Sequence, residues 1–283
     1  MTEILSAVLA SSAPLLFAAL GALATEYAGV LAVFMDGAIN LAAFICIAVT
    51  AATGSPLAGF AAAAAGTIVF VGAAALYTEA TGANPFLTGL SLNLFSAGIT
   101  SLLSTLVFGT RGVVPLPFSG EAEYIAFSAS LRQFAFPAAL AAAVLMAFFF
   151  HNTKPGAALR ASGSSPRVLE ARGLHPDRYR VFSWMIAAVF AALAGTALSL
   201  PLGAWVPNVS SGRGWTALAA VYLGLRNPLG CVLAALLFSA AEYAANILQG
   251  TGQVSGTLIL GLPYALALAV FILKRKDLGT QTT

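Results

Sequence analysis

No lysine or arginine occurs before Arg111, and this absence constrains the fold more than any other feature of the chain. A soluble domain needs a solvated surface of mixed charge, and ordinary soluble domains are roughly 25% charged. Here only 8% of the 283 residues are charged and 59% are hydrophobic. Half of the chain therefore cannot face water, and we expect an integral membrane protein.

The apolar stretches have the length of membrane helices, since a bilayer core needs about 20 residues per helix. The candidates are Ile4 to Leu23, Gly37 to Ala52, Pro56 to Glu79, Phe86 to Phe108, Leu131 to Phe150, Val181 to Leu200, Trp215 to Leu225, Pro228 to Leu248 and Leu258 to Leu273. The first lacks the basic flank and short core of a secretory signal, so we expect a retained span.

Two pieces are short for a span, Trp215 to Leu225 and Glu26 to Asp36. Irregular backbone at membrane depth survives only where protein or a watery cavity covers it, so both pieces indicate half-helices or re-entrant segments. We therefore predict an all-α, polytopic transmembrane helix bundle of eight to ten membrane segments. The whole chain, residues 1–283, is expected to form one transmembrane domain.

The loop 152–180 holds six of the thirteen basic residues and should be cytoplasmic by the positive-inside rule. The C-terminal run Lys274 to Lys276 is a second basic cluster. An even number of crossings puts both clusters inside, provided that the short piece after Arg213 crosses as well. The linker Gly109 to Ser130 then lies outside. Because the basic residues cluster beside apolar helices, they indicate the orientation of the chain in the membrane. We therefore expect no nucleic-acid partner.

Polar side chains at membrane depth cost about 2.5 to 3.5 kcal/mol on insertion scales, so each needs a partner, a cavity or a function. Those expected to line a pathway for a solute are Glu26, Asp36, Asn40, Asn93, Glu242 and Asn246. Glu242 and Asn246 are four residues apart and share a helix face. The alternative is structural: each carboxylate caps a helix, lies at the interface, or pairs with Arg213 or Arg226.

The cytoplasmic loop mixes helix formers with glycines. Pro166 is suited to the first position of a short helix over Arg167 to Ala171, which Gly173 would end. An arginine-rich helix outside the bilayer suits docking to a soluble partner, or alternatively anchoring to anionic lipid.

The loop resembles that of the permeases of ATP-binding-cassette (ABC) importers for nucleosides, simple sugars and branched-chain amino acids, which reads Leu-Arg-Ala-x-Gly, two variable positions, then Pro. The matching positions, and a further stretch after them, are Gly156, Leu159, Arg160, Ala161, Gly163, Pro166, Glu170, Ala171 and Gly173. The resemblance implies that these residues form an ATPase-coupling loop in a permease domain.

Further motifs extend the resemblance over nearly the whole chain. Its Gly-Arg-Gly segment corresponds to Gly212 to Gly214, and its Glu-x-x-Gly-Val and acidic-Gly elements correspond to Glu26 to Val30 and Asp36–Gly37, with Asp where Glu is usual. The branch it resembles most is that for nucleosides and simple sugars. It implies an ABC ATPase subunit, a second permease, identical or paralogous, and an extracytoplasmic solute-binding protein as partners, in the cell (inner) membrane with its lipid.

The chain contains no Gly-x-x-x-x-Gly-Lys-Ser/Thr phosphate loop, so ATP would be hydrolysed by the partner subunit and no cofactor is expected here. One rival is a secondary transporter, in which Glu26, Asp36 or Glu242 carries the coupling charge. Another is an ABC permease for riboflavin or branched-chain amino acids. An enzyme is disfavoured, because His151 and His175 form no catalytic or ligand constellation. We expect Cys46 and Cys231 to be buried as small hydrophobes.

Overall fold

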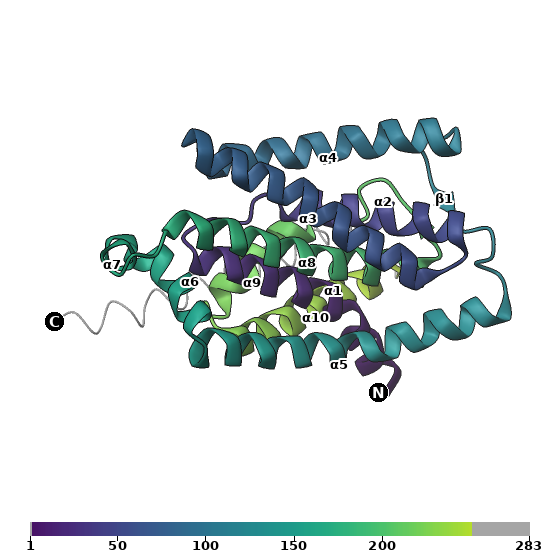
Figure 1. The fold of residues 1–283 in the computed structure, drawn as a ribbon. Coiled ribbons are helices and arrows are strands. Elements are labelled where there is room, and N and C mark those ends of the chain that lie inside the picture. Colours follow the sequence, from purple (N-terminus) through teal and green to yellow (C-terminus); the bar gives the residue numbers. More distant parts are fainter. Residues whose placement is uncertain (1, 251–283) are drawn as a thin grey trace.

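The computed structural model describes residues 2–250 and contains ten α-helices and two short strands in that range (Figure 1). In chain order they are α1 (Thr2–Tyr27), α2 (Met35–Thr53), α3 (Pro56–Thr81), α4 (Pro85–Phe108), β1 (Val114–Pro115), α5 (Ala122–Asn152), α6 (Lys154–Ser164), α7 (Pro166–Ala171), α8 (Pro176–Leu202), β2 (Ala204–Trp205), α9 (Arg213–Leu223) and α10 (Pro228–Gly250). The expectation of a helical bundle is confirmed.

Seven helices of the described part are long and apolar enough to cross a membrane: α1, α2, α3, α4, α5, α8 and α10. The chain is therefore a multi-pass membrane protein. The expected total of eight to ten segments is not confirmed, because the last candidate, Leu258 to Leu273, lies outside the described residues. The piece Glu26 to Asp36 forms no span of its own, since residues 28–34 are turns between α1 and α2.

Small residues bring the helices close together, and α8 is the central packing partner of α1, α2 and α3. A Cβ added to Gly195 of α8 would lie 2.6 Å from the Ile39 carbonyl oxygen of α2. Trp184 of α8 stacks on Phe34 at a centroid distance of 4.4 Å. Close approach through small residues is what holds membrane helices together where lipid supplies no hydrophobic drive. Cys46 and Cys231 are buried and free, as expected.

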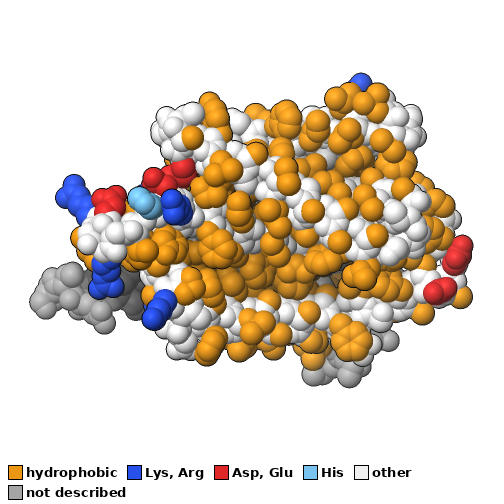
Figure 2. Space-filling view, viewed as in Figure 1, with side chains coloured by type: hydrophobic (Ala, Val, Ile, Leu, Met, Phe, Trp, Pro, Cys, Tyr) orange, Lys and Arg blue, Asp and Glu red, His pale blue; other side chains and the backbone are white. Residues whose placement is uncertain are grey.

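The bundle has two distinct ends, which we name by their elements (Figure 1). At the β1–β2 end the two strands pair antiparallel, Val114 opposite Trp205. At the α6–α7 end two short helices lie outside the bundle. Figure 2 shows basic and acidic side chains together at the α6–α7 end, further acidic side chains at the other end and a largely apolar surface between them.

Two sequence-based boundaries need correction. The expected outer linker Gly109 to Ser130 is shorter, because α5 begins at Ala122, with Glu123 in its first turn. The helix of 31 residues is longer than a bilayer core requires, so its first turns extend beyond the apolar stretch that hydropathy detects. Similarly, α8 begins at Pro176 rather than at Val181, because proline starts the helix within the polar loop.

The segment around Trp215 crosses the bundle in a broken form. The chain leaves β2 at the β1–β2 end, runs through irregular residues 206–212, and continues in the 11-residue helix α9. It reaches Arg226 at the α6–α7 end, where Tyr27 donates a hydrogen bond to the Arg226 carbonyl. The expected short helical piece is present as α9, and turns at residues 207–212 connect it to β2.

Candidate functional site

The first turns of α2 and α9 meet inside the bundle. The Gly214 N–H donates to the Asp36 carboxylate at 3.1 Å, which joins the two helix starts. From there α9 extends about 16 Å, at 1.5 Å per residue, before the chain reaches the α6–α7 end. The contact therefore lies inside the bundle, about 16 Å from the α6–α7 end. We call Asp36, Asn40, Asn93, Ser210 and Gly214 the polar junction.

Asn93 joins α4 to the irregular chain before α2. Its side-chain oxygen accepts from the Gly37 N–H at 2.7 Å, and its amide donates to the Val33 carbonyl at 2.7 Å. The Ser96 hydroxyl donates to the Gly37 carbonyl at 2.6 Å. Both polar groups of Asn93 are thus engaged by backbone that would otherwise be unpaired at membrane depth.

Asn40 does the same for the loop before α9. Its amide donates to the Ser210 hydroxyl at 2.8 Å, and its oxygen accepts from the Ser210 N–H at 3.2 Å. Asn40 and Ser210 are both buried. Sequence reasoning missed Ser210, whose only signal was a polar run directly before the Gly-Arg-Gly segment.

The junction explains why glycine occupies position 214. A Cβ there would lie 2.6 Å from Asp36 Cα, closer than real side chains approach, so the two helix starts could not meet. Asp36 also places a carboxylate between the N-termini of α2 and α9, where helix dipoles favour negative charge. Close approach of the two helix starts therefore explains Gly214 of the Gly-Arg-Gly segment, and the helix dipoles explain the carboxylate beside it.

An ion pair lies beside the junction. The guanidinium of Arg213 is 3.6 Å from the Glu242 carboxylate of α10, and the side chains are 23% and 30% exposed. Asn246, one turn further along α10, is exposed, and Tyr243 is half-buried. Unlike Asn40 and Asn93, the side chains of this ion pair, Tyr243 and Asn246 have hydrogen-bond donors or acceptors left for a further partner.

Glu26 lies apart from the junction, at the α6–α7 end. It is 7% exposed and forms an ion pair with Arg226 at 2.5 Å, while the neighbouring Tyr27 hydroxyl binds the Arg226 carbonyl. We call Glu26, Tyr27 and Arg226 the inner cluster. The structural alternative, pairing with Arg213 or Arg226, thus holds for Glu242 and Glu26. Asp36 caps α9, and the six predicted pathway residues do not form one site.

The predicted coupling loop divides into a packed and an exposed part. Gly156 and Leu159 are buried, whereas Gly163, Glu170, Ala171 and Gly173 are exposed. Arg160 is half-buried, and its Nε is enclosed without a hydrogen-bond partner. The expected short helix is present as α7, with Pro166 in its first turn and Gly173 left-handed at φ +74° after it.

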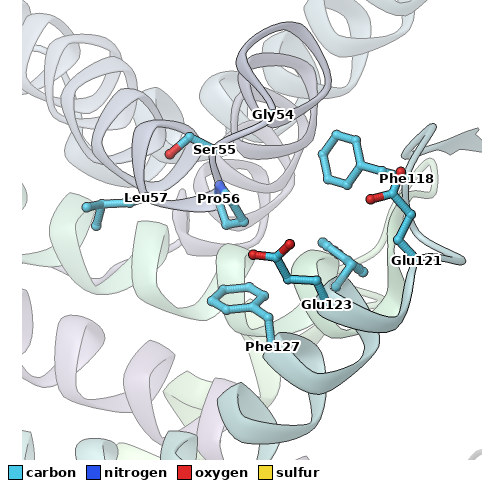
Figure 3. A pocket seen from close by; sticks show the side chains of 9 residues that line it. Gly54, Ser55, Pro56, Leu57, Phe118, Glu121, Glu123 and Phe127 are labelled. Atoms are coloured by element: carbon cyan, nitrogen blue, oxygen red, sulfur yellow. The ribbon is translucent and has the colours of Figure 1, made fainter.

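A hollow of about 460 Å³ opens at the β1–β2 end, between the α2–α3 turn and the start of α5 (Figure 3). Glu121 and Glu123 point their carboxylates into it, opposite Ser55 and Pro56. No ion pair within the described residues uses either carboxylate. The hollow therefore carries two carboxylates, while Arg111 and Arg132 are exposed at the same end of the bundle.

Comparison with known proteins extends over most of the chain. TsgC13 of Haloferax volcanii, named as a proposed glucose ABC transporter permease protein, is 28% identical over 83% of this chain and 74% of its own. The guanosine ABC transporter permease protein NupQ of Bacillus subtilis is 25% identical over 95% and 90%. The nucleoside ABC transporter permease protein NupC of Lactococcus lactis subsp. cremoris is 23% identical over 93% and 89%.

No solved structure matches the chain. The family model described as branched-chain amino acid transport system / permease component matches residues 4–273, which include all seven candidate spans, the polar junction and the loop helices. This protein belongs to that family of ABC transporter permeases.

Proposed function

We propose that this chain forms the translocation pathway of an ABC importer for a nucleoside or a simple sugar. The observation that carries the proposal is the polar junction, where the starts of α2 and the short helix α9 meet inside the bundle. Pro207, Asn208 and Ser211 of the loop before α9 are exposed. Irregular backbone cannot face lipid, so this surface borders a watery path or a second permease.

The groups that we assign to the solute are those with hydrogen-bonding capacity left. Arg213 and Glu242 form a half-buried ion pair, and Asn246 and Trp215 are exposed nearby in the chain. Asp36, Asn40 and Asn93 instead hold the backbone in place. Glu26 belongs to the α6–α7 end and is assigned to coupling.

Energy comes from a partner in this proposal. The sequence has no phosphate-binding loop, so an ABC ATPase subunit hydrolyses ATP and docks on the exposed residues of α6 and α7. Six basic residues in 152–180 support a cytoplasmic location for this end. The β1–β2 end then faces outward, where the free carboxylates of Glu121 and Glu123 are available to a solute-binding protein.

The C-terminal basic cluster is assigned to the same side as the loop. Between them lie α8, the broken crossing through α9, α10 and the predicted span Leu258 to Leu273, which make four crossings. An even number returns the chain to the cytoplasm. The test is a reporter enzyme fused after Thr283 that is active only outside the cytoplasm. Activity of this fusion would contradict the assignment.

The solute class is supported by relatives whose names specify glucose, guanosine and nucleosides. The experiment is uptake into vesicles that hold the permease, its ATPase and its binding protein, with labelled guanosine and glucose as competing substrates. We expect uptake of one of them to require ATP and to survive a protonophore. Uptake that is indifferent to ATP and abolished by the protonophore would favour the secondary transporter.

A further inference from the structure

Strained backbone in the described chain is concentrated around α9. Four non-glycine residues in the described range have left-handed φ: Asn208 at 58°, Ser211 at 48°, Leu225 at 59° and Arg226 at 55°. The first two precede α9 and the last two follow it. L-residues avoid this conformation, and such strain clusters at functional and switching segments. The short helix is thus bounded by two strained joints.

Polar contacts hold both ends of α9. At its start the Asp36 carboxylate accepts from the Gly214 N–H, and Asn40 binds Ser210. At its end the inner cluster fixes the Arg226 side chain and carbonyl to the last turn of α1. Such contacts are discrete and can be exchanged, unlike the interdigitated core of α1 and α8.

The inner cluster is in turn connected to α6. Gly163, near the end of α6, lies against the turn that follows Tyr27: a Cβ at position 163 would be 2.5 Å from the Gly29 N atom. Gly29 is itself left-handed, at φ +82°. A displacement of α6 therefore meets backbone directly, with no flexible side chain between to absorb it.

We propose that α9 is a gate that moves as a unit about its two strained joints. Glu26 and Arg226 are the positioning residues that link it to α6. An ATPase docked on α6 and α7 shifts α6, the Gly163–Gly29 contact shifts the last turn of α1, and the inner cluster carries the shift to Arg226. This inference rests on the proposed function, because it needs an ATPase that drives the loop.

The first test separates coupling from folding by measuring ATP hydrolysis and uptake in the same vesicles. In Glu26→Gln and Arg226→Gln we expect ATP hydrolysis to continue and the ATP used per solute to rise at least about tenfold, the scale of coupling between sites. Glu79→Gln is the matched control, because it breaks another ion pair at the same end, between α3 and Arg180 of α8. Its ratio should stay at the wild-type value.

A wild-type ratio in both inner-cluster variants would overturn the inference. If ATP-dependent uptake is absent even in the wild-type complex, the proposed function fails instead.

The second test replaces the inner-cluster ion pair by a covalent link. Glu26→Cys and Arg226→Cys are combined in a background with Cys46→Ala and Cys231→Ala, and the pair is joined by a short, reducible bifunctional thiol reagent. Because the inner cluster carries the shift from α1 to Arg226, we expect the unlinked pair to use more ATP per solute, linking to return that ratio toward the wild-type value, and reduction to raise it again. Glu79→Cys with Arg180→Cys should keep the wild-type ratio with and without the link. A ratio that linking the Glu26 and Arg226 pair leaves unchanged would overturn the inference.

Discussion

Replacing Asn93 by leucine distinguishes a structural role from a role in solute binding. The substitution keeps the branching at Cγ but removes two hydrogen bonds of 2.7 Å, and leaves the Gly37 N–H and the Val33 carbonyl unpaired. Each unsatisfied buried group costs about 1–3 kcal/mol in soluble proteins. Hydrogen bonds between membrane helices average only about 0.6 kcal/mol. We therefore expect Asn93→Leu to destabilise the protein by about 1–4 kcal/mol.

Thermal unfolding in detergent or nanodiscs is the assay. A loss of 1 kcal/mol lowers Tm by about 2–4 °C for a chain of 150–250 residues, so a fall of several degrees is expected. Asn246→Leu is the control, because Asn246 is exposed on α10 and should leave Tm unchanged. The reasoning is refuted if Asn93→Leu keeps the wild-type Tm while it abolishes uptake, since Asn93 would then act on the solute.

Three other substitutions test separate parts of the fold. Gly214→Ala should lower the folded yield and Tm, because the added Cβ would lie 2.6 Å from Asp36 Cα, and overpacking costs about 1–3 kcal/mol; normal yield and Tm would count against the junction. Tyr124→Phe removes the 2.6 Å hydrogen bond to the Leu200 carbonyl and should cost about 1 kcal/mol in the same assay, without changing the ATP used per solute. Glu242→Gln should reduce uptake more than stability, since a half-exposed ion pair contributes about 1 kcal/mol or less; equal uptake by variant and wild type would remove Glu242 from the pathway.

Much of the fold follows from local sequence signals. Apolar runs of about 20 residues locate the membrane helices, because the bilayer fixes their length. Proline and glycine locate the breaks: Pro166 begins α7, and the glycines around Arg213 mark the start of α9. These features depend on residues close together in the chain, so they can be read without knowing the tertiary structure.

The roles of the polar residues could not be predicted in the same way. The partners of Asn40 and Glu26 are 170 and 200 residues away, at Ser210 and Arg226. A polar residue in an apolar run indicates that a partner, a cavity or a function is needed. Only the packing of α1, α2, α9 and α10 determines which of the three applies. Hydropathy also missed the first turns of α5 and α8, because polar residues in a helix outside the bilayer leave no apolar signal.

The division of labour among these residues has a consequence for specificity within the family. The side chains that pair with backbone groups, Asn40, Asn93 and Asp36, are needed for the fold whichever solute is transported. A substitution there should therefore disturb folding before it alters the choice of solute. The side chains of the Arg213–Glu242 pair and of the exposed side of α9 have no such structural role. Selection between a base-bearing and a purely hydroxylated solute should therefore be set there, by side chains that can change while the polar junction stays constant.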